Sequence, residues 1–109
     1  MSSEHEHSHE EHEGALEKFE EVKDVKPSRN GEFVGQEGEN FYVALSEDEV
    51  YALSPLAYYI WSLCDGEHSV EDLAGKMSQD LNVNPDEAKE VLAIALIRMS
   101  EVDLIHMPK

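Results

Sequence analysis

Four histidines that alternate with acidic residues form the metal-like cluster of this sequence. They are His5, His7, His9 and His12. Neutral imidazoles at this density bind Zn, Ni or Cu weakly, but no Cys and His spacing for a tetrahedral site is present. Because no apolar residue follows Met1 in this stretch, it cannot offset the entropy cost of ordering. We predict a disordered, acidic and His-rich tail over residues 1–14 without a metal site, and we keep metal handling by the tail as an alternative.

Cys64 and His68 are a second pair whose types could do chemistry, since a histidine can activate a thiol. The predicted place of Cys64 is the C-terminus of a helix, where the dipole raises the pKa of a thiol, and no third group orients His68. We therefore predict a buried core cysteine and a turn-forming role for Asp65. No glycine-rich phosphate loop, HExxH, CxxC or Ser-His-Asp pattern occurs. The expectation is a protein that is not an enzyme and needs no cofactor.

The charge balance restricts the partners. The 109 residues carry 25 acidic and 8 basic side chains, a formal net charge of −17. Nucleic acids are held by Lys and Arg, so neither nucleic acid nor an anionic membrane is an expected partner. The length suits one domain, and the sequence offers no membrane-spanning run or secretion signal. We expect a cytoplasmic protein.

A small α+β domain must position these groups. Residues 15–31 are predicted to form an arm and a turn, with either a short packed helix or an extended chain over its first part. Strand-like runs follow at 32–36, 41–45 and 49–53. The apolar period then becomes helical, after N-caps at Ser54, Ser69 (with Asp72 as a capping box) and Asn84. We predict a three-stranded antiparallel sheet followed by three helices, the last ending near Val102.

The helices carry more apolar residues than one core face needs. In the first helix the predicted core side is Leu56, Ile60, Leu63 and Cys64, and in the second it runs from Val70 to Leu81. In the third helix it comprises Ala88, Val91, Leu92, Ala95, Leu96, Met99 and Val102. Ile94 and Ile97 fall outside that face, among charged residues. They need a second contact, which could be a partner, the mate in a dimer, or the N-terminal arm folded back.

The run at 49–53 is a candidate binding edge. A three-stranded sheet has two edge strands, whose N–H and C=O groups lack strand partners. An extended peptide can pair there as a fourth strand. If this strand is an edge beside the third helix, Ile94 and Ile97 line the groove between them. The sequence leaves the strand order open, and a plain edge strand without a ligand is the alternative.

Several residues of this region occur in an order typical of one family. They are Leu53-Ser54-Pro55-Leu56-Ala57, Ile60-Trp61, Leu63-Cys64-Asp65-Gly66, and Ser69-Val70 with Leu73. On these residues and the apolar third helix, the stretch from Phe41 to Ile105 resembles the PqqD-like family, also called RiPP recognition elements. Ser54 stands where the family usually has Asn, and both residue types cap a helix. The acidic, His-rich tail is not a family feature.

The resemblance implies a winged-helix-like domain over residues 32–109 that acts as a non-catalytic peptide chaperone. Family members bind the leader of a ribosomally made precursor peptide as a strand beside the third strand and against the third helix. They present it to a modifying enzyme, often a radical SAM protein. The implied peptide-binding residues in this chain are Val50, Tyr51, Ala52, Lys89, Ile94, Ile97 and Arg98. The expected partners are a precursor leader peptide and a radical SAM-type maturation enzyme, in pyrroloquinoline quinone synthesis or another pathway.

Other functions and assembly states stay open beside this one. A winged-helix DNA-binding regulator has the same element order, but the exposed side of the third helix is too acidic for DNA, with Asp86, Glu87, Glu90 and Glu101 against Lys89 and Arg98. Metal handling by the tail is the other functional alternative. Contact through the isoleucine face gives a weak homodimer in place of a monomer.

Overall fold

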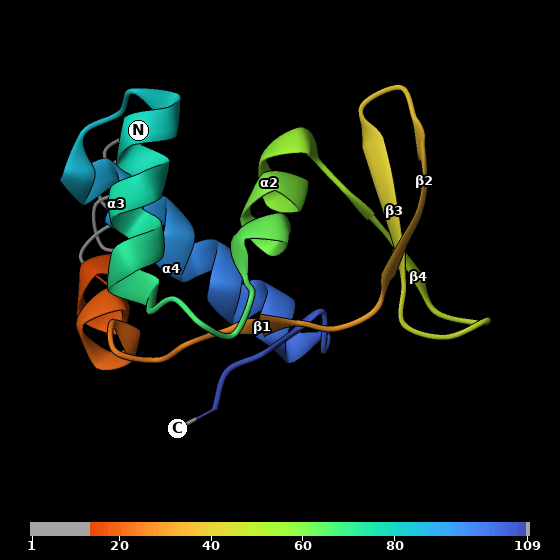
Figure 1. Ribbon diagram of the computed structural model, residues 1–109, viewed down its shortest axis with the longest axis horizontal. Helices are drawn as coiled ribbons and strands as arrows, with labels where there is room; N and C mark the ends of the chain where they lie inside the picture. Colours follow the sequence, from red (N-terminus) through yellow and green to blue (C-terminus); the bar gives the residue numbers. More distant parts are fainter. Residues whose placement is uncertain (1–13, 109) are drawn as a thin grey trace, which may run out of the picture.

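The computed structural model describes residues 14–108 of the chain, so the histidine cluster and its metal-handling hypothesis lie outside the described residues. Residues 14–22 are helical. The later elements, shown in Figure 1, are β1 (Ser28–Arg29), β2 (Glu32–Glu37), β3 (Asn40–Ala44), β4 (Val50–Leu53), α2 (Pro55–Leu63), α3 (Val70–Leu81), α4 (Pro85–Glu101) and β5 (Ile105–His106). The predicted α+β fold, with a three-stranded antiparallel sheet followed by three helices, is confirmed. Its likeness to a winged-helix domain stays a prediction.

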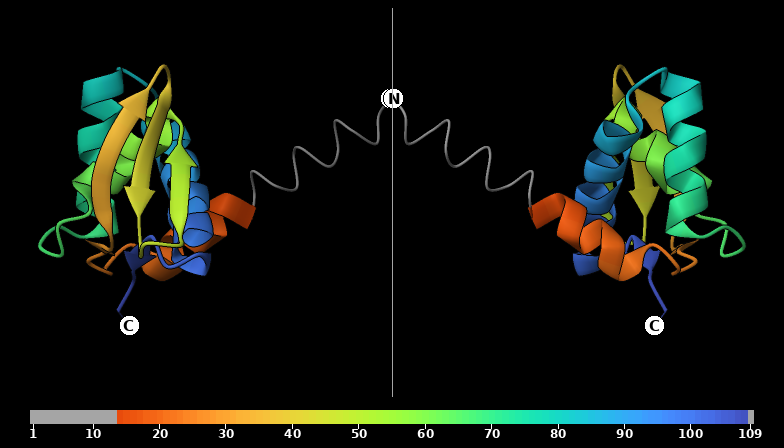
Figure 2. Two further views of the ribbon diagram at one scale, coloured as in Figure 1. Left: turned by 90° about the vertical axis from the view of Figure 1, so that its right-hand side faces the viewer. Right: turned by 90° about the vertical axis from the view of Figure 1, so that its left-hand side faces the viewer.

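The main sheet has the strand order β2-β3-β4, with β3 in the centre. Figure 2 (left) looks onto this sheet, with α2 behind it and α4 beyond the β4 edge. An aromatic cluster ties the sheet to α2: Phe41 stacks on Tyr58 with ring centroids 4.5 Å apart, and Phe33 lies 5.2 Å from Tyr58. Tyr58 stacks in turn on Trp61, whose Nε1–H donates to the Leu104 carbonyl at 3.0 Å. These contacts hold the sheet at a set position relative to the helices.

The predicted N-caps start the three helices. The Ser54 hydroxyl accepts the N–H of Ala57 at 3.2 Å. Ser69 and Asp72 form the reciprocal capping box, each side chain accepting the other's backbone N–H, and Asn84 caps α4. Each cap satisfies backbone donors that a helix N-terminus leaves unpaired.

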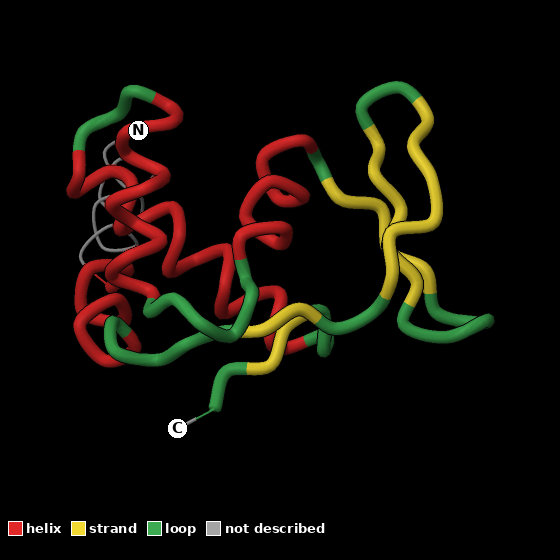
Figure 3. The backbone as a smooth tube through the Cα atoms, in the orientation of Figure 1, coloured by secondary structure: helices red, strands yellow, loops and turns green. Residues whose placement is uncertain are grey.

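The chain before β2 is an integral part of the fold. Phe19, in the N-terminal helix, is 1 % exposed and belongs to the core. The segment that follows is extended along the turn between α2 and α3, where the N–H of Gly66 donates to the carbonyl of Pro27 at 2.8 Å. Gly66 adopts a positive φ of 77° there, a conformation that favours glycine. Beyond this turn β1 pairs with β5 near the C-terminus (Figure 3). For the first part of the arm the packed helix is therefore the confirmed alternative, and the extended chain is not found there.

The buried side of the helices differs from the prediction at five positions, one of which is Trp61 of α2, which the prediction omits and which is 5 % exposed. Leu56, Leu81 and Val102 are exposed rather than buried, at 42, 41 and 37 %. Leu81 and Val102 lie at the last residue and the C-cap of their helices, where the chain turns away from the core. Ala93, which the prediction omits, is fully buried. The N-terminal helix explains it, because Lys89, one turn earlier on α4, has its Nζ 5.4 Å from the centroid of the Phe19 ring.

Candidate functional site

The edge strand β4 presents regular, unpaired backbone groups. β3 and β4 pair without interruption from Phe41↔Leu53 to Ala44↔Val50. Next to this ladder, the N–H of Leu45 donates to the carbonyl of Glu49 at 2.8 Å. Hydrogen-bonded and non-bonded pairs alternate along antiparallel strands. Tyr51 and Leu53 therefore direct their N–H and C=O groups toward β3, and Val50 and Ala52 direct theirs outward.

The opposite edge, β2, is less suited to pairing. Its register with β3 shifts between Phe33 and Gly35, and such a bulge bends a strand and disrupts the ladder. Acidic side chains stand at both ends of β2, at Glu32 and Glu37. Bulges and charges are the usual protection of an edge against further strands. Of the two edges of this sheet, β4 is the one open to an added strand.

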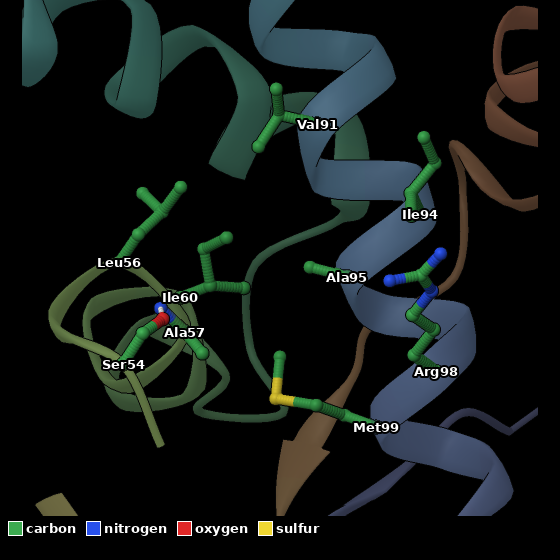
Figure 4. Close-up of a pocket in the computed structure, with 9 residues that line it drawn as sticks. All are labelled: Ser54, Leu56, Ala57, Ile60, Val91, Ile94, Ala95, Arg98 and Met99. Carbon is green, nitrogen blue, oxygen red and sulfur yellow. Dashed lines mark hydrogen bonds between the residues drawn. The ribbon is translucent and has the colours of Figure 1, made fainter. Parts of the chain in front are cut away.

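An apolar pocket of about 350 Å³ lies between α2 and α4, where the chain leaves β4. It is lined by Ser54, Leu56, Ala57, Ile60, Val91, Ile94, Ala95, Arg98 and Met99. Figure 4 shows Ala95 and Met99 extending from α4 toward Ile60 and Ala57 of α2. The exposure of Leu56, which the core prediction did not anticipate, follows from its place in this lining. The pocket is large enough for one or two apolar side chains.

Arg98 is the charged residue of the pocket lining. Its side chain makes no ion pair or hydrogen bond with any residue from 14 to 108. Ile94 lies one turn earlier on the same side of α4, so an apolar surface flanks the guanidinium. The site therefore combines outward backbone groups on β4, an apolar pocket, and a cation at its rim.

Comparison with known proteins assigns this arrangement to a family. The model of the family described as coenzyme PQQ synthesis protein D (PqqD) matches residues 42–105, which include β4 and the three capped helices. The chain belongs to the PqqD family. The PqqD family is an accessory, non-catalytic one in cofactor biosynthesis. No curated protein matches the chain. The match begins at Tyr42, so the N-terminal helix, β1 and β2 lie before the part that the PqqD model covers.

The residues implied by the PqqD resemblance fall into two groups in space. Ile94 and Arg98 line the pocket. Val50, Tyr51 and Ala52 belong to β4 and do not line it, and the lining residue next to this strand is Ser54. Lys89 and Ile97 do not line the pocket. Lys89 covers the Phe19 ring, and Ile97 lies between Lys89 and Ile94 around α4, about 80° from the first and about 60° from the second. A role for either in peptide binding stays a prediction.

The sequence reasoning missed part of the lining. Val91, Ala95 and Met99 are predicted as core residues. Met99 belongs to the core and the other two pack against it, and all three also line the pocket. Core and pocket share one apolar arc of α4, so periodicity could not divide them. The width of that apolar arc was one available signal, because packing against α3 alone buries a narrower part of the α4 surface.

The nucleophilic and acidic groups near the α2–α3 turn are buried or form hydrogen bonds within the turn. Burial raises the pKa of the Cys64 thiol to about 12, and the prediction of a buried core cysteine is confirmed. The Asp65 carboxylate accepts the N–H groups of Glu67 and His68 at 2.9 and 3.2 Å and pairs with His68 Nδ1 at 2.8 Å. These bonds, led by that of Glu67, lower the Asp65 pKa to about 2. The predicted turn-forming role of Asp65 is confirmed.

The part of the chain that the structure describes has neither a cluster of metal-binding side chains nor a membrane-spanning helix. Between residues 14 and 108, no three His, Cys, Asp or Glu side chains are grouped so that they could hold a metal ion. Over the same range, no helix has the length and apolar character needed to cross a bilayer.

Proposed function

We propose that this protein captures the leader of a ribosomally made precursor peptide by adding it as a strand to β4, and that it presents the leader to a radical SAM-type modifying enzyme. The observation that carries the proposal is the open, regular edge of β4 beside an apolar pocket. The PqqD match supports the accessory role in biosynthesis.

Main-chain pairing supplies affinity that does not depend on the sequence of the peptide. Val50 and Ala52 each offer an outward N–H and C=O, which allows up to four hydrogen bonds to an added strand. Each such bond contributes about 0.5–1.5 kcal/mol net. The entropy cost of ordering a flexible peptide offsets part of this gain. Backbone bonds alone would therefore give weak binding.

Side chains in the pocket supply the remaining affinity and the selectivity. Alternate residues of a strand face the same side, so every second residue of the added strand faces α4. Burying one leucine-sized side chain contributes about 1.5–3 kcal/mol. The aromatic contacts of Phe41 and Tyr58 keep the sheet fixed against α2, so the cleft needs little rearrangement before it accepts the peptide.

The proposal is tested by NMR titration of the ¹⁵N-labelled full-length protein. The ligands are overlapping synthetic fragments of the short open reading frames encoded beside its gene. One fragment is expected to give saturable shifts in residues 49–54 and in α4 from Val91 to Arg98. It should also slow the hydrogen exchange of the Val50 and Ala52 amides, while the amides of β2 serve as the internal control. Saturable shifts that leave β4 unchanged, or no binding by any fragment, would contradict strand addition.

A further inference from the structure

Arg98 stands out among the cations of an acidic protein. The chain has 25 acidic and 8 basic residues, so a basic side chain has many potential partners. Lys18, Lys23 and Lys76 pair with acids, and the Arg29 guanidinium donates to the Ser62 carbonyl at 2.7 Å. Arg98 has no such partner among residues 14–108, and neither has the exposed Lys26. Of these cations, Arg98 is the one that lines the apolar pocket.

A guanidinium in this position suits a carboxylate. Its planar donors match the two oxygens of a carboxylate, and such charge-assisted bonds are stronger than neutral ones. Arg98 is exposed, and Ile94, which lines the same pocket, lies one turn earlier on α4, so the guanidinium stands at the border between the apolar lining and solvent. An apolar ligand alone would fill the pocket and leave Arg98 without a partner.

We infer that the cleft selects a peptide with an aspartate or glutamate two residues from an apolar side chain, with Arg98 pairing the carboxylate. This inference rests on the proposed strand addition to β4. Residues i and i+2 of a strand face the same side and lie about 6.6 Å apart. Ile94 and Arg98, four residues apart on α4, are separated by about 6.0 Å along the helix axis. α4 lies beyond the β4 edge in Figure 2 (left) and apart from β4 in Figure 1. A strand added to this edge extends the sheet toward the side on which α4 lies, so one apolar residue can meet Ile94 while the acid reaches Arg98.

The charge of the whole protein limits this preference to a single acid. A net charge of −17 repels a strongly acidic ligand at long range. The carboxylate is therefore expected within an otherwise neutral or basic segment. The long-range repulsion disfavours peptides with many acidic residues, and the ion pair with Arg98 favours those with one acid at the right position.

Display of random decapeptides tests the inference, because a random library offers the cleft acids and apolar residues at every spacing. The library is selected against the full-length wild type, Arg98→Glu and the control Lys26→Glu. Lys26 is exposed, does not line the pocket, and its change alters the net charge by the same amount. The wild type and Lys26→Glu should enrich peptides with an apolar residue and an acid two positions apart. Arg98→Glu should lose this acid and enrich Lys or Arg in its place.

A single enriched peptide then gives the magnitude. Replacing its acid by the matching amide should weaken binding to the wild type about three- to tenfold, as for a partly exposed ion pair. The same replacement should change binding to Arg98→Glu less than about twofold.

The outcomes separate this inference from the proposed function. Enriched peptides with no acid preference, or an equal shift with Lys26→Glu, overturn the role of Arg98 and leave peptide capture intact. If the wild type enriches no peptide above the edge variant Ala52→Pro, strand addition fails and the inference fails with it.

Discussion

Replacing Ala52 by proline separates strand addition from other modes of peptide binding. Proline removes one backbone N–H and fixes φ. The N–H of Ala52 faces outward from β4, so the β3–β4 ladder keeps its hydrogen bonds. Proline also drives the preceding residue toward β geometry, which Tyr51 already has. Edge strands tolerate proline for these reasons, and we expect a stability loss of about 1 kcal/mol or less.

The effect on binding should be larger than the effect on folding. One of up to four main-chain bonds to the peptide is lost, at about 0.5–1.5 kcal/mol, and the stranded peptide carbonyl adds about 1–3 kcal/mol if water cannot reach it. A combined loss of about 1.5–4.5 kcal/mol raises the Kd roughly ten- to two-thousandfold.

Calorimetric titration with the fragment that shifts the β4 amides most measures this Kd. Ala52→Val is the matched control, because it keeps the N–H and a residue type that strands favour. It should bind within about twofold of the wild type. A folded Ala52→Pro protein that binds as tightly as the wild type would refute strand addition at β4. Equal weakening by valine and proline would show that the outer face, not the N–H, contacts the peptide.

Three further predictions concern the scaffold. Trp61→Phe should lower the free energy of unfolding by about 1–3 kcal/mol, because the carbonyls of Asn30 and Leu104 both lose the hydrogen bond from the indole Nε1–H, although Leu104 keeps that from the Asn30 N–H. Urea denaturation measures this loss. Tyr58→Phe, which breaks no side-chain hydrogen bond of the described residues, should stay within about 0.5 kcal/mol of the wild type. The Asp65 pKa falls from 3.8 to about 2 on folding, so the stabilising effect of its carboxylate is complete above pH 4 and is lost as the pH falls toward 2. The difference in free energy of unfolding between the wild type and Asp65→Asn should therefore shrink between pH 4 and pH 2. A difference that stays constant would count against the hydrogen bonds of the turn. Burial and a pKa of about 12 should make Cys64 react with iodoacetamide at pH 8 at least about tenfold more slowly in the folded protein than in urea; equal rates would disprove its burial.

The elements of the domain were predictable because their signals are local. The caps at Ser54, Ser69 and Asn84 depend on side chains within three residues of the bonds that they make. The strand runs and the turn at Gly66 depend on equally short spacings. Burial on α4 was predicted less well. Ala93 is covered through contact with the N-terminal helix, about 70 residues earlier in the chain, and no local spacing encodes that contact.

The residues of the candidate site also differ in whether local sequence patterns could place them. Ile94 and Ile97 share one property in the sequence, since both fall outside the predicted core face. In the fold the N-terminal helix packs on the side of α4 that carries Lys89. Ile94 lines the pocket together with Arg98, and Ile97, which lies between the two sides, does not. Leu56 enters the lining only because the sheet places the start of α2 opposite α4.

By itself, the sequence determined the order of strands and helices, the turns and caps between them, and the single cysteine of the core, because hydrogen bonds and periodicity act over a few residues. The residues from Leu53 to Gly66 that are typical of the family are also close together in the sequence. Only the tertiary structure decided that β4 is the open edge, that the bulge falls in β2, and which arc of α4 faces the cleft. Those features depend on strand order and on packing between distant segments, where many weak contacts act together.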